Sequence, residues 1–122
     1  MRIAISCEGK TLESNVDPRF GRCAHLLIVE AEAPDKINLI KVIDNPNVNV
    51  GGGAGISTAQ LAANENVEAI ITGNIGPRAF GVMQQLNIKV YRATGKAIDA
   101  IKQLLEGKLE EITIPGPMWK WR

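Results

Sequence analysis

Residues 67–72 (VEAIIT) form a largely apolar run that ends at Gly73. A run of this kind is typical of a parallel strand that is covered on both faces. The segments on either side agree, because residues 54–66 place small apolar side chains at helical spacing and Pro77 fits the first position of a second helix. The run therefore predicts a layered α/β fold.

Five segments in all have the β-rich apolar character of strands. They are residues 2–7, 25–31, 37–44, 67–72 and 88–92. A third helix is expected over residues 96–106, because Gly107 follows it as a helix-ending glycine would. The predicted order is β β β α β α β α in a mixed five-stranded sheet, and residues 109–114 are a candidate sixth strand.

The direction of these strands predicts where a site would lie. If the first three form an antiparallel meander and the last two return by right-handed crossovers, strands one, three, four and five run in the same direction. Open α/β sheets bind ligands beyond the carboxyl ends of their strands. The loops expected at that edge are residues 7–9, 17–23, 45–55, 73–76 and 93–95.

Length and composition indicate one ordinary domain. The 122 residues are 45% hydrophobic and 22% charged, and the formal net charge of +1 would not steer the chain to nucleic acid or to an anionic membrane. We expect a domain over residues 1–114 and a tail over residues 115–122, which carries Trp119 and Trp121. With two cysteines, no signal-peptide pattern and no membrane-spanning apolar run, we expect a cytoplasmic protein with reduced thiols. The expected oligomeric state is a monomer or weak homodimer.

Cys7, Cys23 and His25 are the candidate metal ligands. Cys23 and His25 would project from the same face if their strand begins by residue 23, and Cys7 lies at the matching end of the neighbouring strand. Thiolate and imidazole suit iron–sulfur chemistry. The alternative is that the thiols are small buried hydrophobic groups. Three ligands fall short of a closed four-ligand site.

Arg19 and Arg22 are candidate ligand contacts in the loop before the second strand. They flank Phe20 and Gly21, and their guanidinium groups could pair with an anionic cluster or an organic acid. The alternative is a salt bridge to Asp17 that only fixes the loop.

Gly51, Gly52, Gly53 and Asn74 are the remaining candidates. The three glycines lead into a helix amino terminus, which favours an anion, although the segment lacks the Gly-Lys-Ser/Thr of a phosphate-binding loop. They could equally serve only as left-handed turns. Asn74 could bond a ligand or hold its neighbouring loop.

Four motifs carry a resemblance to a known family. They are MRIAIS at residues 1–6, VDPRFGR at 16–22, GGG at 51–53 and TGNIGPRA at 72–79. In this order they resemble the nitrogenase iron–molybdenum cofactor biosynthesis family, which includes NifX, NafY and the C-terminal domain of NifB, over about residues 1–107. The resemblance implies a ribonuclease H-like three-layer fold. It also implies a non-catalytic carrier that takes an iron–sulfur or iron–molybdenum cluster from a donor protein and delivers it to an acceptor.

An enzyme and a metal-free binding module are the two alternatives to a carrier. A ribonuclease H-like nuclease needs a carboxylate in its first strand, and residues 2–7 contain no Asp or Glu. His25 is the single histidine, and no serine has a nucleophile-elbow setting, so no catalytic triad can be assembled. We therefore expect no enzyme activity. A metal-free regulatory module that binds a small anion or nucleotide stays open as the alternative.

Overall fold

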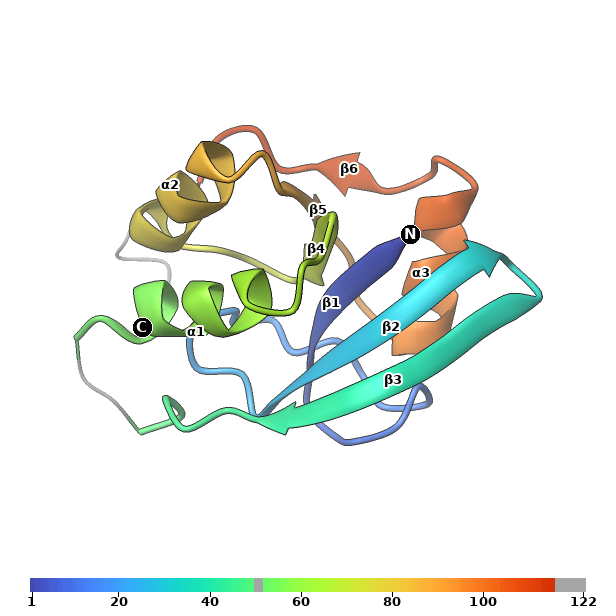
Figure 1. The fold of residues 1–122 in the computed structure, drawn as a ribbon, viewed down its shortest axis with the longest axis horizontal. Helices are drawn as coiled ribbons and strands as arrows, with labels where there is room; N and C mark the ends of the chain where they lie inside the picture. Colours follow the sequence, from blue (N-terminus) through green and yellow to red (C-terminus); the bar gives the residue numbers. More distant parts are fainter. Residues whose placement is uncertain (50–51, 116–122) are drawn as a thin grey trace.

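Six strands form one mixed sheet in the order β3-β2-β1-β4-β5-β6 in a computed structural model that describes residues 1–49 and 52–115 (Figure 1). The elements in chain order are β1 (Arg2–Cys7), β2 (His25–Ala33), β3 (Lys36–Asp44), α1 (Ala54–Ala63), β4 (Ala69–Thr72), α2 (Pro77–Gln85), β5 (Lys89–Arg92), α3 (Ala97–Leu105) and β6 (Glu110–Glu111). The α/β class is confirmed. The sheet has six strands and not five, because Glu110–Glu111 adds an edge strand beside β5.

The pairing of the strands confirms the predicted directions. β1 is antiparallel to β2 and parallel to β4, β2 is antiparallel to β3, and β4 is parallel to β5. The carboxyl ends of β1, β3, β4 and β5 therefore share one edge of the sheet, and the loops that follow them start there.

The helices divide between the two faces of the sheet, which gives three layers (Figure 1). α1 and α2 cover one face over a core that includes Phe20, Ile70 and Met83. α3 covers the other face, where its Ile101 packs in a core that includes Ile5. All four residues of β4 are buried, which explains why its sequence is apolar without alternation.

The helix starts differ in part from the expectation. Pro77 begins α2 as predicted. Ser57 and Thr58 are of residue types that often cap a helix, but neither caps α1, because Gly53 is its N-cap with a φ of 80° and no side-chain cap bond. The Thr58 hydroxyl instead donates to the carbonyl oxygen of Gly21 at 2.6 Å, so this side chain holds a loop.

The helices end earlier in the sequence than the apolar spacing indicated. α1 ends at Ala63, and Asn66 beyond it has a φ of 59°. Leu86 continues the apolar spacing of α2 but is 49% exposed, because it lies at the C-cap. Gly107, with a φ of 72°, follows α3 as predicted. None of the helices within the described ranges has the length and apolar character to cross a membrane. The predicted tail is outside the described residues from 116 onward.

Candidate functional site

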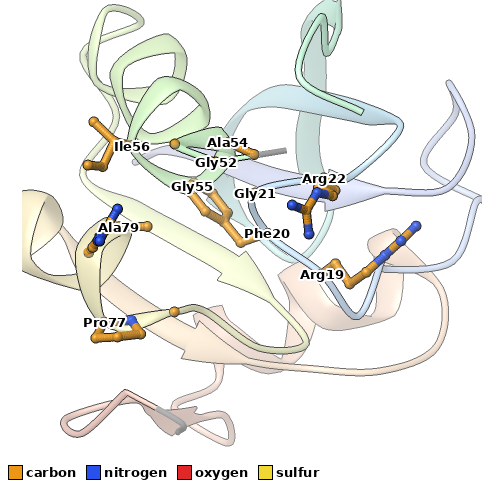
Figure 2. A pocket seen from close by; sticks show the side chains of 13 residues that line it. Arg19, Phe20, Gly21, Arg22, Gly52, Ala54, Gly55, Ile56, Pro77 and Ala79 are labelled. Atoms are coloured by element: carbon orange, nitrogen blue, oxygen red, sulfur yellow. The ribbon is translucent and has the colours of Figure 1, made fainter. Parts of the chain in front are cut away.

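A pocket of about 220 Å³ opens at the predicted edge of the sheet. It is lined by three segments, residues 19–22, 52–56 and 76–79. Figure 2 shows the first of these facing the starts of α1 and α2. Three of the five loops expected at this edge therefore contribute to one cavity.

The first turns of two helices line this pocket. Gly53 and Gly76 are the N-caps of α1 and α2, and neither helix has a side-chain cap bond or an acidic residue in its first turn. Backbone N–H groups in a first turn have no partner within their own helix, and the helix dipole makes that end positive. Two such ends at one cavity favour an anionic ligand.

Three arginines add formal positive charge to the same cavity. Arg19, Arg22 and Arg78 are among its lining residues, and the described lining segments contain no Asp or Glu. In Figure 2 the side chain of Arg22 extends toward the helix starts, whereas that of Arg19 extends away from them. The arginine side chains and the two helix amino termini therefore both make this cavity positive.

The ion pair expected as an alternative for Arg19 is present. Its Nε lies 3.8 Å from Oδ1 of Asp17, while the Arg19 side chain is 56% exposed. An exposed pair of this kind contributes at most about 1 kcal/mol, so it does not prevent Arg19 from turning to a ligand.

Residues 17–23 form the arginine-bearing loop, which Asp17 holds through its carboxylate. Oδ1 accepts a hydrogen bond from the backbone N–H of Arg19 at 3.0 Å, and Oδ2 accepts one from Ala24 at 3.3 Å. The backbone N–H of Asp17 donates to the carbonyl of Ser6 at 2.8 Å. The loop is thereby fixed to the end of β1.

Close backbone approaches explain two glycines of the recognised motifs. A Cβ on Gly21 would lie 2.9 Å from the Cα of Gly55 in α1, and a Cβ on Gly73 would lie 2.5 Å from the Cα of Pro18. Neither position has room for a side chain. These glycines pack the arginine-bearing loop against α1 and against the loop after β4.

A buried polar cluster around Asn45 contacts the arginine-bearing loop, and no sequence motif predicts it. Nδ2 of Asn45 donates to the carbonyls of Gly21 (3.1 Å) and Cys23 (2.8 Å). Oδ1 of Asn45 accepts hydrogen bonds from the backbone N–H and Nδ2 of Asn47, each at 3.0 Å. The cluster joins the loop after β3 to the arginine-bearing loop. Asparagines in a polar loop give no signal that separates these buried amides from solvated ones.

Asn74 does not line the pocket. Its carbonyl accepts a hydrogen bond from the Thr72 hydroxyl at 3.2 Å, and its backbone forms a parallel bridge with Arg19. These contacts match the loop-holding alternative. Gly52 and Gly53 do line the pocket, and the remaining predicted glycine, Gly51, lies outside the described residues.

The three predicted metal ligands do not converge. β2 begins at His25, so Cys23 precedes the strand, and the condition on which these two would share a face is not met. Cys23 packs with Phe20 beneath α1 and α2, whereas Cys7 packs on the α3 side. Cys7 and His25 are paired across β1 and β2, as expected. Over residues 1–49 and 52–115, no three His, Cys, Asp or Glu side chains are grouped to hold a metal ion.

His25 is paired with a carboxylate, and the two thiols are buried. Nδ1 of His25 lies 2.9 Å from Oδ1 of Asp44. Burial, followed by the nearby Asp17 carboxylate, raises the pKa of Cys7 and that of Cys23 from 9.0 to about 12. Both thiols are therefore protonated at neutral pH, and binding iron through either would require loss of that proton.

These raised pKa values predict a pH dependence of stability. Unfolded thiols ionise near pH 9.0 and the folded ones only near 12, so the unfolded chain loses protons first and stability falls as pH rises above 9. Between pH 8.5 and 9.5 the two thiols together should lower the free energy of unfolding by about 1 kcal/mol. Urea titrations at both pH values check this. The Cys7→Ala/Cys23→Ala variant should lack that decrement, and an equal decrement in the variant would contradict the assignment.

The chain is similar to one known family and to several solved structures. The chain matches the family described as dinitrogenase iron–molybdenum cofactor over residues 1–107. An uncharacterized protein of Methanocaldococcus jannaschii is 44% identical over 112 residues, 91% of each chain. The apo form of the orange protein from Desulfovibrio gigas has a TM-score of 0.86 at 33% identity, over 95% of this chain and 96% of that one. A NifB candidate from Thermotoga has a TM-score of 0.78 at 32% identity, over 96% and 97%.

Proposed function

The chain belongs to the dinitrogenase iron–molybdenum cofactor family, and on that premise we propose that it is a non-catalytic carrier of an anionic metal–sulfur cluster. The cargo is an iron–sulfur or iron–molybdenum type cluster, bound transiently during cofactor assembly. Cluster donor and acceptor proteins are the proposed partners. We also propose that the three layers follow the ribonuclease H-like arrangement implied by the resemblance.

One observation carries the proposal, which is the pocket that combines two helix starts with three arginines. Arg19, Arg22 and Arg78 line it together with the N-caps Gly53 and Gly76. Charge-assisted hydrogen bonds from guanidinium and backbone N–H groups suit sulfide or oxygen atoms of an anionic cluster. Phe20, Ile56 and Pro77 give the same cavity apolar walls.

Binding by charge and hydrogen bonds also suits a carrier. A cluster held without covalent protein ligands is released by exchange of hydrogen bonds, and no metal–sulfur bond to the chain has to break. Coordination of the cluster by Cys7, Cys23 and His25 stays a prediction. The buried thiol of Cys7 or Cys23 would first have to become accessible and lose its proton.

The experiment is anaerobic incubation of the chain with iron and sulfide, and in parallel with molybdate added, followed by desalting, absorbance and metal analysis. We expect metal and sulfide to be retained together. Arg22→Gln should weaken retention by about tenfold, because one charge-assisted hydrogen bond is lost. Lys102→Gln is the matched control, since Lys102 is exposed on α3 at the other face of the sheet.

The outcomes separate the carrier from its alternatives. No retained metal in any sample, with binding of inorganic phosphate instead, would favour a metal-free anion-binding regulatory module. Retention that survives Arg22→Gln but is lost in Cys23→Ala or His25→Ala would favour the thiol and imidazole ligands.

A further inference from the structure

Arg92, the last residue of β5, contacts the chain segment that leads into the pocket. Its Nε donates to the carbonyl oxygen of Gly73 at 3.2 Å, and its Nη2 donates to Oδ1 of Asn74 at 3.4 Å. Its Nη1 donates to Oε1 of Glu110 in β6 at 2.7 Å. One guanidinium therefore joins the edge strand β6 to the loop between β4 and α2.

That loop helps to place two of the three segments that line the pocket. It ends at Gly76, the N-cap of α2, where residues 76–79 begin. Its Asn74 forms a parallel bridge with Arg19, the first residue of the arginine-bearing segment. A shift of the loop would therefore move both segments relative to α1.

The planar guanidinium is what these contacts require. Three different nitrogens of Arg92 donate to three different acceptors. A lysine at this position would keep the positive charge but could not make the same set of hydrogen bonds. Charge and geometry can therefore be separated by substitution.

We propose that Arg92 is a positioning residue for the pocket, because it holds residues 73–76 so that the start of α2 faces the arginine-bearing loop. Arg92 is not itself among the residues that line the pocket. The proposal rests on the proposed function, because the placement of this loop matters for binding only if an anionic cluster occupies the pocket.

The test compares Arg92→Lys, Arg92→Gln and Glu110→Gln with the wild-type chain. Amide chemical shifts of Arg19, Asn74 and Arg78 are recorded without metal, and metal retention is measured after anaerobic incubation with iron and sulfide. Both Arg92 variants should shift these amides and weaken retention by about fivefold. Glu110→Gln keeps the bonds of Arg92 to the loop, so its retention should stay within about twofold of wild type.

Each result decides a separate point. Wild-type retention by Arg92→Lys would overturn the proposal, because charge alone would then suffice. Shifts confined to β5 and β6 would overturn it too, since Arg92 would then only join two strands. If the wild-type chain retains no metal, the proposed function fails, and the amide shifts alone then decide whether Arg92 places the loop.

Discussion

Gly73→Ala is expected to lower the free energy of unfolding by about 3 kcal/mol. The new Cβ would lie 2.5 Å from the Cα of Pro18 and 3.0 Å from its carbonyl oxygen. Both atoms belong to the backbone, so the two loops must move apart, and the bond from the Gly73 N–H to the Asp17 carbonyl, now 3.3 Å, would lengthen. Urea unfolding followed by circular dichroism measures the loss.

Gly81→Ala is the matched control for this substitution. Gly81 lies within α2, and a Cβ there meets no atom within 4 Å. Since alanine is favoured over glycine inside a helix by about 1 kcal/mol, this variant should be slightly more stable than wild type. Equal destabilisation by both alanines would contradict the close approach of Gly73 to Pro18.

Asn45→Ala is expected to cost about 3 kcal/mol, because several buried groups lose a partner at once. Asn45 is 6% exposed, and its amide nitrogen bonds the carbonyls of Gly21 and Cys23. The substitution would also release the arginine-bearing loop, so metal retention should fall with stability. Thermal unfolding and metal analysis of the same preparation check both effects.

Asn49→Ala tests whether burial is the cause. Asn49 belongs to the same loop and is exposed, so its substitution should change the free energy of unfolding by less than about 0.5 kcal/mol. A loss for Asn45→Ala that is no larger than this would contradict the role of the buried amide.

The helices and strands were predictable because the sequence signals that mark them are local. The apolar run at β4, the proline at the start of α2 and the glycine after α3 each act within a few residues. Strand directions then followed from the rules of connection. The element ends were less predictable, as Leu86 shows, because the apolar spacing continues into the C-cap of α2, where the side chain is exposed.

The site was predictable in place but not in its contacts. Strand directions placed the arginines, the glycines and the start of α2 at one edge, and the structure brings them to one pocket. The separation of Cys7 from Cys23 depends on the residue at which β2 begins. Contacts of Asn45 and Arg92 depend on loop geometry, which residue type and spacing do not encode.

Amide chemical-shift mapping of the metal-loaded chain tests the central claim most directly. Spectra are compared before and after anaerobic loading with iron and sulfide. We predict that shifts or broadening concentrate at residues 19–22, 52–56 and 76–79, which line the pocket. Changes centred on the α3 face around Cys7, or no change anywhere, would contradict an anionic cluster held between the two helix starts and the arginines.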